Sequence, residues 1–371
     1  MSKLCVIFSH ASLYREPIYR LIDKAFDCEW HFSDEDAGVA RFDVSIFNKV
    51  NVHRHHQLKR FHWIDGINRL LSKKENKTFL MHGGTVDLSC WLFFLRAHLF
   101  YPRKKIYVWG HGWYGKETRV EAFIKRIMWK SVSGVFVYGN YAKKLMIEQG
   151  IPSSHIFVLH NSLDYDVQLE LRNKITGKSS VYHEHFNNDN PNIIYLGRLI
   201  EVKKLDQLID AMAISKANGH HYNIVFVGDG PMKETLKSKA HEKGVEKDIW
   251  FYGASYDQKV NAELVYNADL CVAPGNIGLT AMHCMMFGTP VMSHNDFKWQ
   301  MPEFEAIIPG KTGDYFKRDS VSDIAKAIDL WFDNHKADRE EVRQSCYDVI
   351  DKEWNPYFQI KVIKKSIKFA E

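Results

Sequence analysis

The sequence lacks any long run of apolar residues. No stretch of its 371 residues approaches the roughly 18 apolar residues that a membrane-spanning helix requires. The opening residues, MSKLCVIFSHAS, also lack the apolar core and small-residue cleavage site of a signal peptide, and they are typical of a first β-strand instead. From these two absences we expect a cytoplasmic protein.

Paired cysteines are missing as well. The sequence has six scattered cysteines and no CxxC pair, the positions being Cys5, Cys28, Cys90, Cys271, Cys284 and Cys346. Such scattering favours reduced thiols and argues against a cysteine-based metal site.

Two common catalytic motifs are absent, and a third does not follow the first strand. The sequence contains neither a GxSxG elbow nor a P-loop, so nothing supports an α/β hydrolase or an NTPase. A Rossmann dehydrogenase would carry GxGxxG after an early strand, but the first strand leads into SHASLYREP at residues 9–17. These reaction classes are therefore excluded.

Positive charge is unevenly distributed. Residues 1–164 hold 24 Lys and Arg against 15 Asp and Glu, a net charge of +9, while the remainder holds 26 against 30, a net charge of −4. A basic first half predicts an anionic partner such as a phospholipid surface, a lipid diphosphate or an acidic glycan. No nucleic-acid-binding motif accompanies the charge, so we expect no nucleic acid partner.

Short apolar strands alternate with helical patterns along the whole chain, which is typical of parallel α/β architecture. The strands expected in the first half are Leu4–Phe8, Val44–Phe47, Thr78–Met81, Ile106–Val108, Gly134–Val137 and Ile156–Leu159. Those expected in the second half are Asn192–Leu196, Asn223–Val227, Ile249–Tyr252, Leu270–Ala273 and Val291–Ser293. Helices are expected between them, for example over Leu205–Asn218, Met232–Lys243 and Tyr256–Asn267.

The chain length suits two domains. The alternation of strands and helices is interrupted by the polar, turn-rich stretch KITGKSSVYHEHFNNDNP, which predicts a linker over residues 166–190. The expected domains are residues 1–165 and 191–353, and a helix over about 354–371 may pack back on the first domain.

Three strand-to-helix turns in the second half carry the expected chemistry. The stretch PGNIGLTAMHCMMFGTPV at 274–291 follows an apolar strand and becomes helical near Leu279, and such a turn exposes backbone N–H groups that suit a phosphate. In YLGRLIEVKK at 195–204, Arg198 and Lys203 follow the carboxyl end of a strand, where two cations could clamp a diphosphate. The third turn is VGDGP at 227–231. Taken singly, each turn also has an ordinary structural explanation, which is tight packing for the first and third turns and solvated surface charge for Arg198 and Lys203.

Together these motifs resemble glycosyltransferase family 4, which has the GT-B fold of two Rossmann-like domains facing each other across a cleft. The order and spacing match over about Asn192–Phe316, including MPEF at 301–304 and GKTG at 310–313. In the first half, GHGWYGK at 110–116, YGNYAK at 138–143 and HNSLD at 160–164 are similar to one branch of the family.

The resemblance implies a retaining transfer from a nucleotide sugar, with no metal or other cofactor. Arg198 and Lys203 would stabilise the leaving diphosphate, and His111 would face the sugar from the other side of the cleft. The positions implied to bind the donor are Gly197, Gly228, Asp229, Gly230, Gly275, Asn276, Ile277, Gly278, Leu279, Thr280 and His283.

The sequence departs from the family at one point. The family's donor motif has two Glu residues eight positions apart, and here those positions hold Gly275 and His283. His283 can still hydrogen-bond ribose hydroxyls, whereas Gly275 has no side chain. Recognition of the donor sugar must therefore differ, and an inactive homologue that only binds nucleotide sugars is one alternative.

Several other polar segments have both a functional and an ordinary structural interpretation. His10, Tyr14 and Arg15 follow the first strand and are expected to line the acceptor side. Asp34–Asp36 and Asp164–Asp166 fit the metal-binding DxD pattern but are expected to be solvated loops. The run NVHRHHQLKRFHW at 51–63 is expected to be a basic, aromatic loop rather than a zinc site, because cysteine ligands are missing.

The sequence thus predicts a glycosyltransferase of surface polysaccharide synthesis, acting on a glycan or a lipid-linked oligosaccharide. The apolar stretch at 91–101, followed by three cations at 103–105, could contact an anionic membrane or be a buried helix. A phosphorolytic or epimerising enzyme on the same fold is the remaining alternative, and it would act without an acceptor alcohol.

Overall fold

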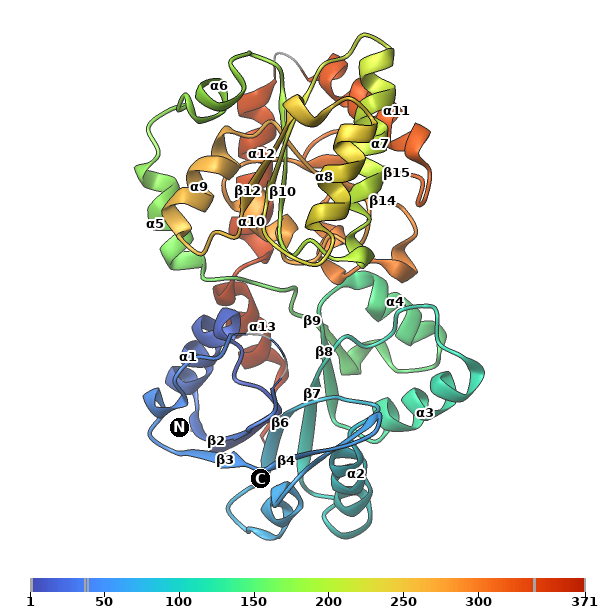
Figure 1. The fold of residues 1–371 in the computed structure, drawn as a ribbon. Coiled ribbons are helices and arrows are strands. Elements are labelled where there is room, and N and C mark those ends of the chain that lie inside the picture. Colours follow the sequence, from blue (N-terminus) through green and yellow to red (C-terminus); the bar gives the residue numbers. More distant parts are fainter. Residues whose placement is uncertain (1–2, 37, 39, 336–337, 370–371) are drawn as a thin grey trace. The chain divides into compact units, whose positions relative to one another are not determined.

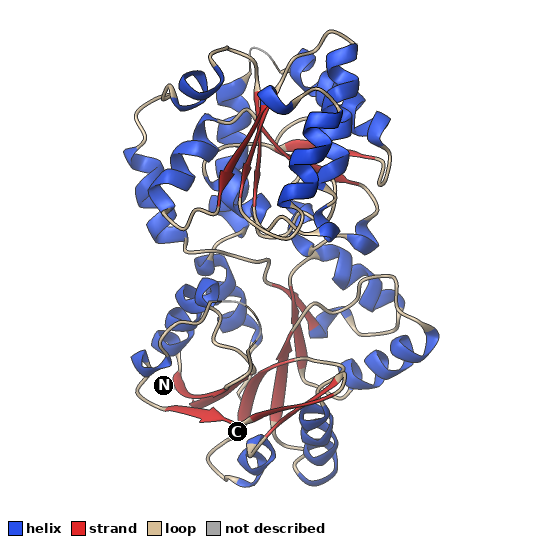
Figure 2. Cartoon of the chain, viewed as in Figure 1, coloured by secondary structure: helices blue, strands red, loops and turns tan. Residues whose placement is uncertain are grey.

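The computed structural model describes residues 3–36, 38, 40–335 and 338–369, which form two compact units (Figure 1). The first unit combines residues up to Asp164 with the segment from Asn355, and the second comprises Tyr165–Trp354. Each unit is a parallel sheet covered by helices, as Figure 2 shows by colour. The expected pair of Rossmann-like α/β folds is therefore confirmed.

The first unit contains a seven-stranded parallel sheet in the order β3-β2-β1-β6-β7-β8-β9. Its strands are β1 (Lys3–Phe8), β2 (Asp27–Ser33), β3 (Val50–His53), β6 (Thr78–His82), β7 (Lys105–Trp109), β8 (Gly134–Val137) and β9 (Ile156–Val158). An antiparallel hairpin of β4 (His55–Leu58) and β5 (Phe61–Ile64) follows β3. The helices are α1 (Glu16–Ala25), α2 (Leu88–Phe100), α3 (Arg119–Lys130), α4 (Asn140–Glu148) and α13 (Pro356–Ser366).

Alternating side chains of this sheet build two cores, one on each face. Ile7, Met81 and Val108 pack under α2, α3 and α4, while Val6 and Leu80 pack on the opposite face with α1 and α13. Parallel strands buried on both faces require this continuous apolar composition. The C-terminal segment thus contributes α13 to the first unit, where Gln359 Nε2 donates to the His160 carbonyl oxygen over 2.9 Å.

The second unit has a six-stranded parallel sheet in the order β12-β11-β10-β13-β14-β15. Its strands are β10 (Asn192–Leu196), β11 (Asn223–Val227), β12 (Ile249–Gly253), β13 (Leu270–Ala273), β14 (Val291–His294) and β15 (Gly313–Phe316). Its helices are α5 (Tyr165–Lys174), α6 (Val181–Phe186), α7 (Leu205–Ala217), α8 (Lys233–Glu242), α9 (Gln258–Asn267), α10 (Thr280–Met286), α11 (Val321–Asn334) and α12 (Arg339–Glu353).

One predicted strand is wrong. Residues Val44–Ile46 form a 3₁₀ turn, because the Asp43 carboxylate accepts the Ser45 N–H and holds the chain in a tight local loop. Phe47 then packs its ring on Trp30, with ring centroids 4.5 Å apart. Strands β2 and β3 were missed because charged and polar residues interrupt their apolar pattern.

The segment expected to link the domains is largely helical. It forms α5 and α6 within the second unit, where the buried Tyr182 hydroxyl donates to the Leu264 carbonyl oxygen over 2.6 Å. The segment is polar because its two helices are short and each buries only one side, so most of its residues face solvent. Among the described residues, no helix combines the length and the apolar character needed to cross a bilayer.

Candidate active site

The second unit presents a ligand crevice where its strand order reverses. Strands β10 and β13 are neighbours, but their connections run to opposite sides of the sheet. Open α/β sheets bind ligands outside the carboxyl ends of strands at such a point. The turns after β10 and β13, at 197–204 and 274–279, lie there, so the structure brings together two motifs that are about 75 residues apart.

Lys203 joins these two turns. Its Nζ donates to both the carbonyl oxygen and Oδ1 of Asn276, each over 2.7 Å. An ammonium group has three N–H bonds, so one remains for a ligand. Burial lowers the pKa of Lys203 to about 8, an effect that the Arg198 charge reinforces and the buried Glu303 opposes. Lys203 is therefore a fixed cation that still carries its proton at neutral pH.

Arg198 differs from Lys203 because its side chain is exposed. Its positive charge is close enough to lower the pKa of Lys203. Two cations held near each other repel, and a bound dianion removes that repulsion. The pair therefore suits a diphosphate better than a neutral ligand.

Three glycines allow the neighbouring turns to pack directly against the backbone of the turn at 197–204. A Cβ at Gly228 would lie 1.8 Å from the Gly197 carbonyl oxygen, and one at Gly230 would lie 2.4 Å from that of Leu199. A Cβ at Gly275 would lie 2.1 Å from the Val202 carbonyl oxygen. All three glycines thus shape the turn that carries Arg198 and Lys203. Their implied role as donor contacts stays a prediction.

The turn before α10 offers fewer backbone donors than the sequence suggested. The N–H of Ile277 donates to Gln300 Oε1 over 3.0 Å, and the Ile277 side chain is buried. The N–H of Gly275 donates to the Lys203 carbonyl oxygen over 2.9 Å. Both amides are therefore engaged within the protein. Among the described residues, the amides of Asn276, Gly278, Leu279 and Thr280 donate to no backbone carbonyl oxygen.

The remaining predicted donor residues have definite surroundings. The Thr280 hydroxyl donates to the Leu196 carbonyl oxygen over 2.8 Å and so fastens α10 to the end of β10. His283 is neutral, because burial lowers its pKa to about 4, and its Nδ1 accepts from Gln168 Nε2 over 3.0 Å. Its proton is therefore on Nε2. Asp229 is exposed and pairs with Lys233 of α8.

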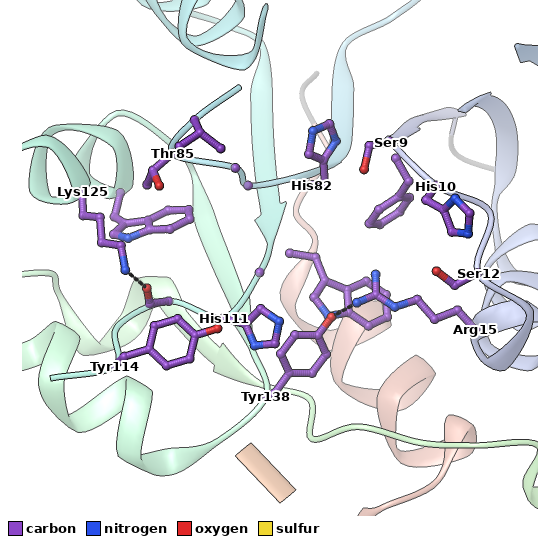
Figure 3. A pocket seen from close by; sticks show the side chains of 18 of the residues that line it. Ser9, His10, Ser12, Arg15, His82, Thr85, His111, Tyr114, Lys125 and Tyr138 are labelled. Atoms are coloured by element: carbon purple, nitrogen blue, oxygen red, sulfur yellow. Dashed lines mark hydrogen bonds between the residues drawn. The ribbon is translucent and has the colours of Figure 1, made fainter. Parts of the chain in front are cut away.

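The first unit has a pocket of about 400 Å³ at the carboxyl ends of its central strands (Figure 3). Its wall brings together all four first-half residues singled out from the sequence, which are His10, Tyr14, Arg15 and His111. They come from the turns after β1 and β7. The pocket again lies where the strand order reverses, between β1 and β6.

Arg15 is the uncompensated charge of this pocket. Its Nε donates to the Tyr14 hydroxyl over 3.1 Å, its Nη2 donates to the Tyr138 hydroxyl, and its guanidinium lies 5.3 Å from the Trp109 ring centroid. Among the described residues it forms no ion pair with a carboxylate. Stacking on an aromatic ring and donating to hydroxyls hold a cation in place without neutralising it.

His111 adds a neutral polar group beside Arg15. Burial lowers its pKa to about 4, and the charges of Arg15 and Lys125 act in the same direction. Its ring lies 4.9 Å from the Tyr138 ring, and its buried Nδ1 has no hydrogen-bond partner among the described residues. A buried polar atom of this kind needs a partner, and a ligand hydroxyl would provide one.

The loop that carries His111 is held by Glu117. Its carboxylate accepts the backbone N–H groups of Tyr114, Gly115 and Lys116 over 2.8 to 3.1 Å and the Lys125 ammonium over 2.6 Å. Lys125 lines the pocket but is neutralised by this pair. The wall is therefore rigid around His111, and its net positive charge comes from Arg15.

His82 lines the pocket on the opposite side and was missed from the sequence. It directly follows the predicted strand Thr78–Met81, so the same rule that selected His10 could have found it. Its Nε2 lies 2.8 Å from Asp87 Oδ2, and its Nδ1 lies 3.5 Å from the Ile7 carbonyl oxygen. Burial alone would lower the pKa of His82, but Cys90 and Asp87 raise it well above its usual value.

We expect this buried pair to make stability depend on pH. The raised pKa of His82 means that its contribution is complete below about pH 6.5 and is lost as the pH rises through the folded-state pKa. The pKa of Asp87, opposed by burial but held down by His82 and Ser89, is about 2, so its contribution is lost only in strong acid. Asp87→Asn should lower the free energy of unfolding by about 3 kcal/mol at pH 6.

Urea denaturation at pH 6 and pH 9 measures this effect. The deficit of Asp87→Asn should be smaller at pH 9, because the contribution of the raised His82 pKa declines once the pH exceeds about 6.5. Asp43→Asn is the matched control, because Asp43 also accepts a backbone N–H at the start of a turn but has no histidine partner. An equal deficit at both pH values would contradict the charged pair.

Residues 177–347, a little less than half of the chain, match the family described as Glycosyl transferases group 1. An "Uncharacterized 41.2 kDa protein in cps region" of Klebsiella pneumoniae is 24% identical over 233 residues, which cover 60% of this chain and 60% of that protein. A "GDP-mannose-dependent alpha-(1-6)-phosphatidylinositol dimannoside mannosyltransferase" of Mycobacterium tuberculosis is 34% identical over 27% of this chain and 26% of its own length.

Solved structures match over nearly the full length. The "lipopolysaccharide outer core galactosyltransferase WaaB apo form" aligns with a TM-score of 0.73 at 14% identity and covers 98% of both chains. The Anabaena protein Alr3699/HepE in complex with UDP aligns with a TM-score of 0.71 at 15% identity over 98% of this chain and 99% of that one. At this identity the likeness concerns the fold, which is GT-B.

Proposed function

We propose that the whole chain is a glycosyltransferase that uses a nucleotide-sugar donor, and the match of residues 177–347 to the glycosyl transferases group 1 family is the premise. One observation carries the proposal: Lys203 is fixed between the two turns at the switch point of the second sheet, with Arg198 beside it. The solved structure of HepE, which shares the fold, was obtained with UDP.

The reaction is transfer with retention of anomeric configuration. The acceptor hydroxyl oxygen bonds to the anomeric carbon on the face from which the diphosphate departs. The bond from that carbon to the phosphate oxygen breaks, and the departing oxygen takes the hydroxyl proton. Arg198 and Lys203 stabilise the charge that develops on the diphosphate, and so no metal is required. Gly275 offers no side chain to act as a nucleophile.

The acceptor binds in the pocket of the first unit and belongs to a surface polysaccharide or a lipid-linked oligosaccharide. Arg15 supports an anionic or hydroxyl-rich ligand, and the unpartnered Nδ1 of His111 supports a hydrogen bond to a sugar hydroxyl. The relatives from a cps region and from lipopolysaccharide synthesis agree with this class of acceptor.

A thermal-shift screen against UDP, GDP, ADP and their sugar conjugates tests the donor site. A ligand at 100 times its dissociation constant should add about 2.7 kcal/mol of stability. A shift with one nucleotide identifies the base. Absence of any shift from a folded sample contradicts the proposal. A shift without turnover would instead favour the nucleotide-sugar-binding homologue that the missing Glu pair suggests.

The protein docks on an anionic membrane through two helices of the first unit. Helix α3 exposes Val120, Phe123, Ile124 and Ile127, whose spacing of three and four residues forms one apolar stripe directed away from the core. Their exposed fractions are 36 to 68%. Helix α2 exposes a second apolar set, consisting of Leu88, Leu92, Leu95, Leu99 and Phe100.

Positive charge flanks these stripes. The exposed cations on and next to the two helices are Arg103, Lys105, Lys116, Arg119, Arg126 and Lys130. An apolar stripe bordered by cations is the pattern of a helix that lies in the interface of an anionic bilayer. Because α3 also supplies Lys125 and Trp129 to the pocket wall, docking would bring the acceptor pocket close to a lipid-linked acceptor.

Vesicle cosedimentation should show this docking. We expect binding to vesicles that contain phosphatidylglycerol and little binding to pure phosphatidylcholine. Phe123→Ser with Ile127→Ser should weaken binding at least about tenfold, because two apolar side chains no longer enter the interface. Ile214→Ser with Leu330→Ser, two exposed apolar positions of the second unit, is the control. Equal binding by both double variants would contradict this surface.

A further inference from the structure

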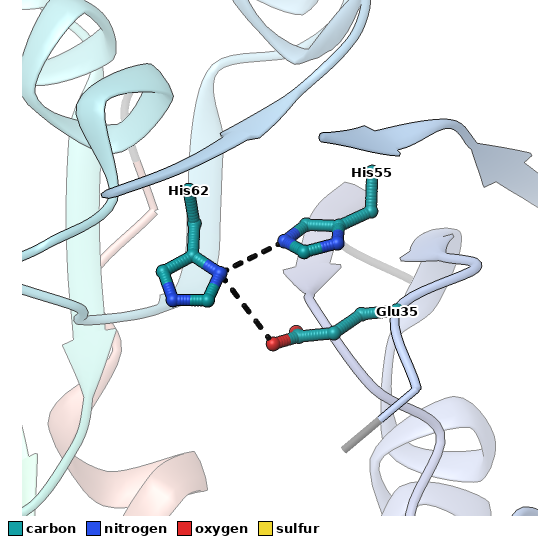
Figure 4. Close-up of side chains that lie close together, drawn as sticks. All are labelled: Glu35, His55 and His62. Carbon is teal, nitrogen blue, oxygen red and sulfur yellow. Dashed lines mark hydrogen bonds and ion pairs between the residues drawn. The ribbon is translucent and has the colours of Figure 1, made fainter. Parts of the chain in front are cut away.

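Three side chains with metal-binding atoms converge outside both sites described above (Figure 4). His55 Nε2 lies 2.9 Å from His62 Nδ1, and a carboxylate oxygen of Glu35 lies 3.8 Å from the same His62 atom. All three ligand atoms lie within 4.8 Å of one another. The Glu35 and His62 side chains are 20% and 28% exposed, so an ion from solvent can reach them.

The backbone holds these groups in place. The hairpin pairs Gln57 with His62 and His55 with Ile64, which puts the two histidines on the same face as diagonal neighbours. The loop after β2 supplies the third group, and Asp34 in that loop accepts the His55 N–H over 2.6 Å. Glu35 is therefore fastened beside the hairpin by the residue that precedes it.

We propose that Glu35, His55 and His62 bind a Zn²⁺ ion. Zinc takes imidazole nitrogen and carboxylate oxygen at about 2.0 to 2.2 Å in tetrahedral geometry, so its ligand atoms lie about 3.3 Å apart. The observed separations of 2.9 and 3.8 Å lie on either side of that value. Two imidazoles disfavour Mg²⁺ and Ca²⁺, which prefer oxygen. Water completes the coordination.

This proposal departs from the expectation from the sequence. The histidine run between residues 51 and 63 is expected from the sequence to be a basic, aromatic loop because cysteine ligands are missing. The third ligand comes from Glu35, 20 residues before His55, and only the folded chain brings it close. A second cluster, His82 with Asp87 and Cys90, carries no such inference, because the ion pair and the N-cap of α2 already engage its groups.

A bound ion would fix the rim of the first unit's pocket. The Glu35 carbonyl oxygen accepts from His10 Nδ1 over 3.1 Å, and the His62 N–H donates to the Val86 carbonyl oxygen over 3.0 Å. His10 and Val86 both line the pocket. The ion therefore links the loop after β2 to the hairpin at the point where each of them supports the pocket wall.

Metal titration of the full-length protein tests the site. Protein stripped with a chelator and freed of it should bind Zn²⁺, measured by competition with a chromophoric chelator. His62→Ala and Glu35→Gln should each weaken binding at least about tenfold, since loss of even an outer partner of a metal ligand costs that much. Co²⁺ should give a visible absorption band in the wild type that both variants lose.

His56→Gln is the matched control. His56 lies on the opposite face of the hairpin from His55 and His62 and pairs with Asp65, so its loss should leave Zn²⁺ affinity unchanged. Zn²⁺ should also slow amide hydrogen exchange over residues 33–36 and 55–64 in the wild type but not in Glu35→Gln, a loop variant that leaves the hairpin sequence intact. Wild-type Zn²⁺ affinity no higher than that of the His55→Ala, His62→Ala double variant would overturn the proposal.

Discussion

Replacing Arg198 with alanine is expected to lower the turnover rate at least about 100-fold, the scale of losing one preorganised group that stabilises charge in a transition state. The side chain is exposed and lies beside Lys203, so its loss should leave the unfolding midpoint unchanged. Steady-state kinetics with the donor identified by the thermal-shift screen measures the effect. Arg198→Lys should recover part of the rate, because it restores the charge without the planar fork of donors.

The same variant should change the pH dependence in a defined direction. The pKa of Lys203 is about 8, mainly through burial and partly through the Arg198 charge. A diphosphate needs the protonated lysine, so kcat/KM of the wild type should fall as the pH rises through about 8. Removing Arg198 raises the pKa of Lys203, and the alkaline limit of the variant should therefore move to higher pH.

A control separates this site effect from a general loss of positive charge. Lys247→Ala removes an exposed cation before β12, an edge strand of the sheet, and should leave both rate and pH profile unchanged. Unchanged turnover in Arg198→Ala would refute the donor site. An unshifted alkaline limit would show that the two cations do not act together.

The sequence revealed the second unit better than the first, for a physical reason. Its first five strands are short apolar runs separated by glycine-containing turns, and all five were predicted; β15, Gly313–Phe316, was missed because it is short and half polar. In the first unit, β2 includes Asp27, Glu29 and His31, whose side chains are paired in the fold. Charged residues interrupt the apolar pattern from which a strand is predicted, so such a strand is not recognised.

The site residues also divide into those that a local pattern predicts and those that it does not. His10, Tyr14, Arg15 and His111 were selected because they follow the carboxyl ends of strands, a position that the chain order reveals. Gln168 and Gln300 were missed because their partners, His283 and Ile277, are distant in sequence and neither segment carries a local signal. Such contacts depend on tertiary packing, which no local pattern records.

Gly275 shows how one such contact changes the chemistry of a motif. The family that the sequence resembles carries Glu at this position, but here a Cβ would lie 2.1 Å from the Val202 carbonyl oxygen and 2.7 Å from the Lys203 Cα. Side-chain atoms do not approach backbone atoms that closely, so the turn after β10 occupies the space that a Glu would need. The absent carboxylate is therefore a consequence of how this turn is packed.

Gly275→Ala should consequently lower donor binding and turnover together. The added methyl group must displace the turn, and with it Lys203, whose carbonyl oxygen accepts the Gly275 N–H. We expect a destabilisation of about 1 to 3 kcal/mol, typical of overpacking, and loss of the nucleotide-induced thermal shift. Gly275→Glu, which restores the family residue, should lower activity for the same reason.

Gly219→Ala provides the comparison for this prediction. Gly219 has a positive φ of 88°, which Gly275 lacks, and a Cβ there meets no atom of the described residues within 4 Å. Its substitution should cost about 1 to 2 kcal/mol of backbone strain and leave the nucleotide-induced shift intact. If both variants lose similar stability but only Gly275→Ala loses nucleotide binding, Gly275 is needed to position Lys203. Wild-type binding by Gly275→Ala would instead show that the turn can move without disturbing the cation, and that the missing Glu needs another explanation.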